Sequence, residues 1–212
     1  MPKIKSAQLE EIIQIYKERR IAIRKRLKEF SAIQPADYFY ELVYCLLTPQ
    51  SSAVHAEQVV AKLHEAEFQY CDVNPEPFLR RKECYIRFHR TKSLHLLRMK
   101  DQFSVIAPKL SEPVSAMELR EWLVKNVLGL GYKEASHFLR NIGINDGLAI
   151  LDRHILRNLK RLGVINSIPK SISRKHYLDI ERRFLKFAID LGITLDELDL
   201  VFWSMETGEI RK

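Results

Sequence analysis

Two residues in the middle of the chain could perform covalent chemistry. Lys133 directly follows a pair of glycines, Gly129 and Gly131, and Asp152 follows a short apolar run at 149–151. The neutral amine of a lysine is a nucleophile, and the start of a helix favours that form because the helix dipole opposes a positive charge there. A carboxylate beside the amine could stabilise developing positive charge and transfer protons. We therefore regard Lys133 and Asp152 as candidate catalytic residues.

The elements that must position Lys133 are two helices joined by the glycine turn. The pattern predicts a helix over 118–127 and a second one that ends at Gly143, each with apolar residues three and four positions apart. Glycines allow backbone conformations that a Cβ would forbid, and amides at a helix start favour a bound anion such as a DNA phosphate. This arrangement predicts a helix-hairpin-helix element that binds DNA through Gly129, Leu130 and Gly131.

Asp152 precedes a further helical run, 153–163, and its position is typical of an N-cap residue. Each signal alone has an ordinary structural explanation, because a glycine turn, a capping aspartate and a solvent-exposed lysine are all common. Their occurrence in this order and at this spacing favours a catalytic site.

Composition predicts an all-α protein that binds a polyanion. The 212 residues include 35 Lys and Arg against 27 Asp and Glu, which gives a net charge of +8. Glycines and prolines are few, and helical periodicity dominates. No run of eighteen apolar residues and no signal peptide is present, so we expect no membrane association and a cytoplasmic location.

The three cysteines, Cys45, Cys71 and Cys84, are widely separated and form no C-x-x-C pair. This spacing predicts neither a disulfide framework nor a metal site.

Three other segments matter for the site. A polar turn at 48–52 separates helices predicted from 35 and from 53, and Thr91 is predicted to cap a helix. Between them, cationic residues alternate with Tyr85 and Phe88, a pattern that suits nucleic acid, although the two aromatic residues could equally belong to the core. These cations are Arg80, Arg81, Lys82, Arg87, Arg90 and Lys92. Prolines 108 and 113 suggest a boundary between two lobes, 31–110 and 1–30 plus 111–212, of one unit spanning 1–212.

From about Tyr38 to Lys212 the sequence resembles the helix-hairpin-helix DNA glycosylase superfamily, through LGLGYKEASHFLRNIG and LAILDRHILRNL. The stretches LLTPQSSA, YIRFHRTKS and LDLVFWSMETGEIRK resemble its archaeal and bacterial second family of 8-oxoguanine DNA glycosylase/AP lyases. The resemblance implies that superfamily's fold, with two helical lobes. Some relatives carry a four-cysteine iron–sulfur cluster near the C-terminus, which is not expected here because no cysteine follows Cys84.

The resemblance also implies roles for individual residues. Lys133 would attack the sugar and Asp152 would assist it, while Gln50 would fill the space left by an extruded base. Ser51 and Ser52 would lie near the lesion pocket. The base would be recognised by Phe88, Trp203 and the terminal carboxylate of Lys212.

The implied activity is excision of 8-oxoguanine from double-stranded DNA, followed by strand cleavage. No cofactor is required, although a monovalent cation can bind at the hairpin. We expect a monomer in the nucleoid of a prokaryotic cell. Two alternatives stay open: an endonuclease III-like enzyme for oxidised pyrimidines, and a non-catalytic helix-hairpin-helix DNA-binding protein.

Overall fold

The computed structural model describes residues 6–210, and within them every regular element is a helix, which confirms the all-α prediction. The chain divides into two compact units, Met1–Ala32 with Gly143–Lys212, and Ile33–Ile142. This division places the second boundary after Ile142, whereas the prolines predicted it near residue 110. The reason lies in packing, because α7 (Tyr132–Asn141) contacts α2 (Tyr38–Leu47). None of the helices in 6–210 is long and apolar enough to cross a bilayer.

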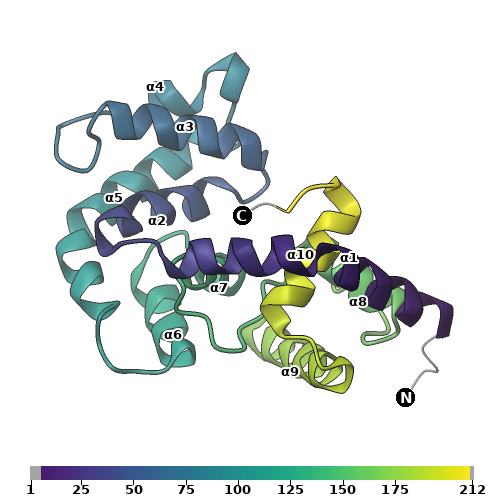
Figure 1. Cartoon of the computed structure of the whole chain (residues 1–212). Helices are drawn as coiled ribbons and strands as arrows, with labels where there is room; N and C mark the ends of the chain where they lie inside the picture. Colours follow the sequence, from purple (N-terminus) through teal and green to yellow (C-terminus); the bar gives the residue numbers. More distant parts are fainter. Residues whose placement is uncertain (1–5, 211–212) are drawn as a thin grey trace. The chain divides into compact units, whose positions relative to one another are not determined.

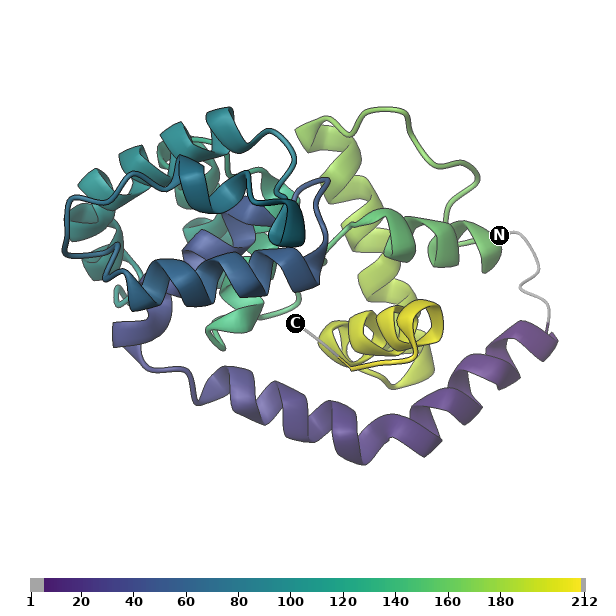
Figure 2. The same cartoon turned by 90° about the horizontal axis from the view of Figure 1, so that it is seen from above.

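Within residues 6–210, the discontinuous unit contains four helices, whose course can be followed in Figure 1. They are α1 (Ser6–Ser31), α8 (Arg153–Arg161), α9 (Arg174–Leu191) and α10 (Leu195–Thr207). The last of these packs against the other three, and Figure 2 shows it beside α1. Thr194 begins α10 with a capping box to Glu197, whose carboxylate also accepts a hydrogen bond of 2.8 Å from Arg24 of α1. The first and last parts of the described chain therefore share one core.

The continuous unit is built around α2. Eight of its ten residues are buried, and it packs against α3, α5 and α7. Its elements, with η marking 3₁₀ turns, are η1 (Pro35–Asp37), α2, α3 (Ala53–Glu65), α4 (Glu76–Leu79), η2 (Lys82–Cys84), α5 (His89–Lys109), α6 (Ala116–Asn126) and α7. Because α2 contacts α3, α5 and α7, it fixes the segments that carry the predicted DNA-contacting residues of this unit.

The predicted cap at Thr91 is wrong. Helix α5 begins at His89, and its N-cap is Phe88, which has a left-handed backbone with φ +59°. The backbone N–H of Lys92 donates to the carbonyl of Phe88, so Thr91 lies within the first helical turn. By contrast, the predicted cap Asp152 accepts a backbone N–H bond in the structure, as do the N-cap residues Ser173 of α9 and Thr194 of α10.

Candidate active site

The predicted helix-hairpin-helix consists of α6, the turn 127–131 and α7. Ser115 and Glu118 form a capping box that begins α6, and Gly131 is the N-cap of α7. The turn is closed by a hydrogen bond of 3.2 Å from the Leu130 amide to the Val127 carbonyl. The local sequence therefore builds the hairpin as predicted, with α7 starting one residue before Lys133.

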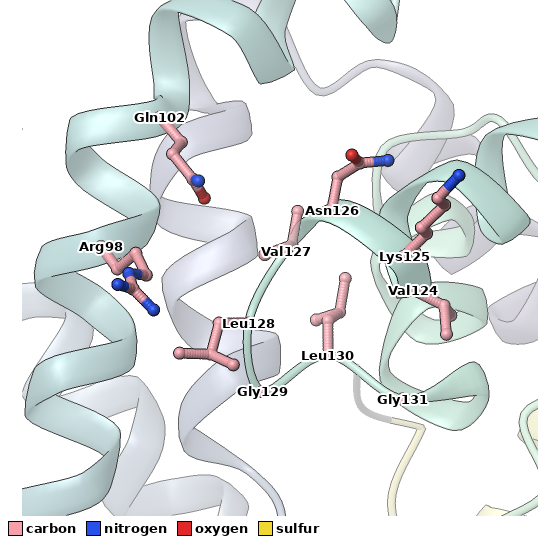
Figure 3. A pocket seen from close by; sticks show the side chains of 10 residues that line it. All are labelled: Arg98, Gln102, Val124, Lys125, Asn126, Val127, Leu128, Gly129, Leu130 and Gly131. Carbon is pink, nitrogen blue, oxygen red and sulfur yellow. The ribbon is translucent and has the colours of Figure 1, made fainter.

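A pocket of about 510 Å³ lies between this hairpin and α5 (Figure 3). Arg98 and Gln102 line it from α5, and Leu128 extends toward Arg98. Lys125 adds a second cation at the end of α6. The remaining lining residues are Val124, Asn126, Val127, Gly129, Leu130 and Gly131. Two cations beside a glycine turn are suited to an anion such as a phosphate.

Gly129 is the hairpin residue most dependent on having no side chain. Its φ is +88°, and a Cβ there would lie 2.2 Å from Nδ1 of His95. Burial lowers the pKa of His95, and the nearby cation Lys92 lowers it further. The imidazole ring under the turn thus fixes how closely the hairpin backbone approaches α5.

Replacing Gly129 with alanine should therefore destabilise the hairpin by at least about 1–2 kcal/mol, the usual cost of a left-handed non-glycine residue. We expect a lower melting temperature and weaker binding to undamaged duplex DNA. Gly131→Ala is the matched control, because φ of Gly131 is −91° and a Cβ there would meet only the end of the Glu134 side chain. Equal effects of the two substitutions would contradict this explanation.

Lys133 is the second residue of α7, and its side chain is 22% exposed. Its Nζ lies 3.9 Å from a carboxylate oxygen of Glu134. The seven residues from Ala135 to Asn141 are all buried, so the rest of the helix is anchored in the core. The amine is thus attached to a rigid element while remaining accessible.

Asp152 has both carboxylate oxygens engaged. Its Oδ1 accepts a hydrogen bond of 2.8 Å from the Ile155 amide, which makes Asp152 the N-cap of α8. Its Oδ2 accepts a bond of 2.8 Å from the indole Nε1 of Trp203 on α10. These two donors hold the carboxylate in one orientation.

The contact between Asp152 and Trp203 was not predicted from sequence, which assigned the tryptophan to base stacking alone. The Trp203 ring also lies 5.3 Å from that of His154, centroid to centroid. Hence one indole orients the candidate catalytic carboxylate and is itself held by a neighbour. Lys212, the third predicted base-recognition residue, lies outside the described residues.

The polar turn between α2 and α3 presents Gln50. This residue is exposed and has a left-handed backbone, with φ +54°. Ser52 caps α3 through its hydroxyl, whereas Ser51 Oγ accepts a hydrogen bond of 3.0 Å from the Arg87 amide. Ser51 therefore joins the turn to the segment before α5.

Phe88 is 50% exposed and Tyr85 45% exposed, so neither is a core residue. The Arg87 guanidinium lies 4.9 Å from the centre of the Phe88 ring. The prediction that Lys92 faces phosphates is wrong, because this lysine is only 5% exposed and its ammonium bonds to the 47–51 segment. Its role could not be recognised from a pattern of alternating charged and aromatic residues.

The structure thus groups the predicted residues within each unit. Gln50, Ser51 and Phe88 lie in Ile33–Ile142, the unit that also carries the hairpin with Lys133, and Ser51 is bonded to the Arg87 amide next to Phe88. Asp152 and Trp203 are bonded in the other unit. Among residues 6–210, no group of three or more His, Cys, Asp or Glu could hold a metal ion. The three cysteines are free.

Comparison with known proteins decides the family. A family model described as 8-oxoguanine DNA glycosylase matches residues 23–193. The chain belongs to this family. Among its members, the 8-oxoguanine DNA glycosylase/AP lyase of Fusobacterium nucleatum is 40% identical over 219 residues, covering 98% of this chain and 99% of the relative. An enzyme of the same name from Korarchaeum cryptofilum is 38% identical and covers 90% of each chain.

Solved structures of this family have the same fold. The Methanocaldococcus jannaschii 8-oxoguanine glycosylase/lyase, in complex with 15mer DNA containing 8-oxoguanine, matches with a TM-score of 0.86 and 32% identity over 96% of this chain and 99% of that one. The Thermotoga maritima 8-oxoguanine DNA glycosylase matches with a TM-score of 0.85 and 31% identity over 96% and 98%. The predicted family and its helix-hairpin-helix glycosylase fold are confirmed.

Proposed function

We propose that the protein excises 8-oxoguanine from double-stranded DNA and then cleaves the strand as an AP lyase. The observation that carries the proposal is Lys133, an accessible amine at the start of α7 directly after the glycine hairpin, in a chain of this family. A binding hairpin alone would need no nucleophile at this position.

The base must leave the duplex before the amine can reach its sugar, at a cost of a few kcal/mol for unstacking. Gln50, exposed on its turn, is proposed to fill the gap, with Ser51 and Ser52 next to the lesion. Phe88 and Trp203 are proposed to stack on the extruded base, at roughly 1–3 kcal/mol for each such contact. The proposed role of Lys212 is to accept a hydrogen bond from the base through its terminal carboxylate.

The proposed chemistry begins with the neutral amine of Lys133. Its nitrogen bonds to C1′ of the deoxyribose while the bond from C1′ to the base breaks, and the base leaves with that electron pair and gains a proton. The sugar ring then opens to an iminium, which is the Schiff base. This cation acidifies C2′, so that loss of a C2′ proton expels the 3′ phosphate. Asp152 is proposed to stabilise the positive charge and to transfer protons.

The proposed steps use side chains of one chain, so we propose a monomer that acts on DNA in a prokaryotic nucleoid. Gly129, Leu130 and Gly131 would bind a backbone phosphate beside Arg98 and Lys125 of the pocket. A monovalent cation would fit the hairpin because backbone carbonyls are suitable ligands for such ions. Lysine chemistry itself requires no cofactor.

Borohydride trapping on matched duplexes tests this function. Borohydride reduces the Schiff base and leaves protein bound to DNA, so a covalent band should form with 8-oxoguanine and with an abasic site, but not with guanine. A band with thymine glycol in place of 8-oxoguanine would instead indicate an enzyme for oxidised pyrimidines. Binding without any covalent band would indicate a non-catalytic hairpin protein.

A further inference from the structure

Lys92 is a buried lysine whose ammonium has only uncharged hydrogen-bond partners. It lies in the first turn of α5 and is 5% exposed. Its Nζ donates to the carbonyl of Leu47 at 2.6 Å, to the carbonyl of Pro49 at 2.7 Å and to the hydroxyl of Ser51 at 3.1 Å. An ammonium has three N–H donors, and all three donate to acceptors in the 47–51 turn.

These acceptors determine the shape of the turn that carries Gln50. The Leu47 carbonyl ends α2, where a cation interacts favourably with the helix dipole. The Pro49 carbonyl belongs to the peptide group that immediately precedes Gln50. Fixing that peptide from one side supports the left-handed conformation of Gln50, which a non-glycine residue rarely adopts alone.

The same lysine is connected to Phe88 by two routes. Its backbone N–H donates to the Phe88 carbonyl at 2.9 Å. Its ammonium shares Ser51 Oγ with the amide of Arg87, the residue before Phe88. Gln50 and Phe88, two exposed residues with a left-handed backbone, are therefore both connected to Lys92, Gln50 through the ammonium and Phe88 through the backbone N–H and Ser51.

A buried cation without a carboxylate partner is unfavourable unless its hydrogen bonds are made. Burial is the main reason that the pKa of Lys92 is lowered to about 8, while Glu134 raises it and Lys133 lowers it by smaller amounts. An apolar side chain of similar length would avoid this cost. The ammonium is therefore explained by the acceptors that it binds, namely the Leu47 and Pro49 carbonyls and the Ser51 hydroxyl.

We propose that Lys92 is a positioning residue that holds Gln50 and Phe88 in the conformation needed to extrude the damaged base. The inference rests on the proposed function, because it assigns a step within it. Lys92 would contact neither base nor sugar. Its loss should impair extrusion and leave the reaction of Lys133 with an exposed sugar largely intact.

Lys92→Met is the test, with two substrates measured under single-turnover conditions. Excision of 8-oxoguanine from a duplex should slow by roughly 10- to 100-fold, in line with the effect of misplacing a positioning group. Cleavage at a preformed abasic site, which has no base to unstack, should change by less than about threefold, because the Lys133 amine is retained and only its electrostatic interaction with the Lys92 charge is lost. Equal loss on both substrates, or no loss on either, would overturn the proposal.

Lys100→Met is the matched control. Lys100 lies on the same helix, and its ammonium also donates to a backbone carbonyl, that of Cys71, far from the Gln50 turn in sequence. This variant should keep parental rates on both substrates. If the parental protein does not excise 8-oxoguanine, the proposed function itself is wrong. If the parental protein excises it and Lys92→Met does so equally well, only the role of Lys92 is wrong.

Two further variants keep the test decisive. Combined with Gln50→Ala, Lys92→Met should add little further loss, because both substitutions remove the same step. Fully multiplicative effects would argue against a shared role. If Lys92→Met does not fold, Lys92→Gln keeps a neutral donor that can reach only part of the three acceptors, and it should reproduce the selective loss at smaller size. An unselective loss in Lys92→Gln would count against the proposal.

Discussion

A Lys133→Gln variant should form no borohydride-trapped complex and should show no strand cleavage above background. Glutamine has a similar length, but its amide nitrogen is not nucleophilic and cannot form an iminium. Folding should be unaffected, because Lys133 is partly exposed and its ion contact with Glu134 is 3.9 Å long. Binding to lesion-containing duplex should persist, so a gel-shift assay and a trapping assay on the same sample measure the two properties separately.

Two control variants identify the reason for the loss. Lys133→Arg keeps a positive charge but has no amine that can form a Schiff base, so it should also fail to trap. Lys125→Gln removes a cation beside the same hairpin and should weaken binding while still trapping. Strand cleavage by Lys133→Gln at the parental rate would exclude Lys133 as the nucleophile.

Asp152→Asn should slow base excision by roughly 10²- to 10⁴-fold, the range expected when a proton-transfer group is lost. The structure adds a cost in stability. The carboxylate accepts from both the Ile155 amide and Trp203 Nε1, whereas asparagine has one carbonyl oxygen and can satisfy only one of them well. Loss of one hydrogen bond should lower the free energy of unfolding by about 1 kcal/mol. Single-turnover excision and thermal unfolding measure the two effects.

Trp203→Phe separates orientation of the carboxylate from its chemistry. Phenylalanine keeps an aromatic face but removes the N–H that Asp152 Oδ2 accepts. Its rate should fall by less than that of Asp152→Asn, since the carboxylate remains charged and still caps α8. A folded Asp152→Asn enzyme with the parental excision rate would remove Asp152 from the mechanism.

The features predicted correctly from the sequence are those governed by neighbouring residues. Asp152 caps α8 through the backbone amide three positions ahead, so its signal is local. The glycine hairpin also depends on neighbouring residues, and its helices α6 and α7 form where the spacing of apolar residues predicts them. Thr91 failed as a cap because the left-handed Phe88, supported by contacts with the 47–51 turn, starts α5 earlier.

The features that could not be predicted join residues far apart in sequence. Trp203 and Asp152 are 51 positions apart, and Lys92 reaches a carbonyl 45 positions before it. Neither side chain shows its role in a local pattern, since lysine usually lies at the surface and tryptophan usually packs. Only the folded chain shows that one lysine holds the Gln50 turn and that one indole holds the Asp152 carboxylate.

The split of one unit across both ends of the sequence determines the order in which the protein can fold during synthesis. Residues 33–142 are continuous, so their core can form once that stretch has left the ribosome. Helix α1 is made before them, but its packing partner α10 is among the last segments to appear. Until then its apolar face, which includes Ile12, Ile23 and Phe30, lacks its native cover. For most of translation, the apolar face of α1 therefore has to wait for its packing partner α10.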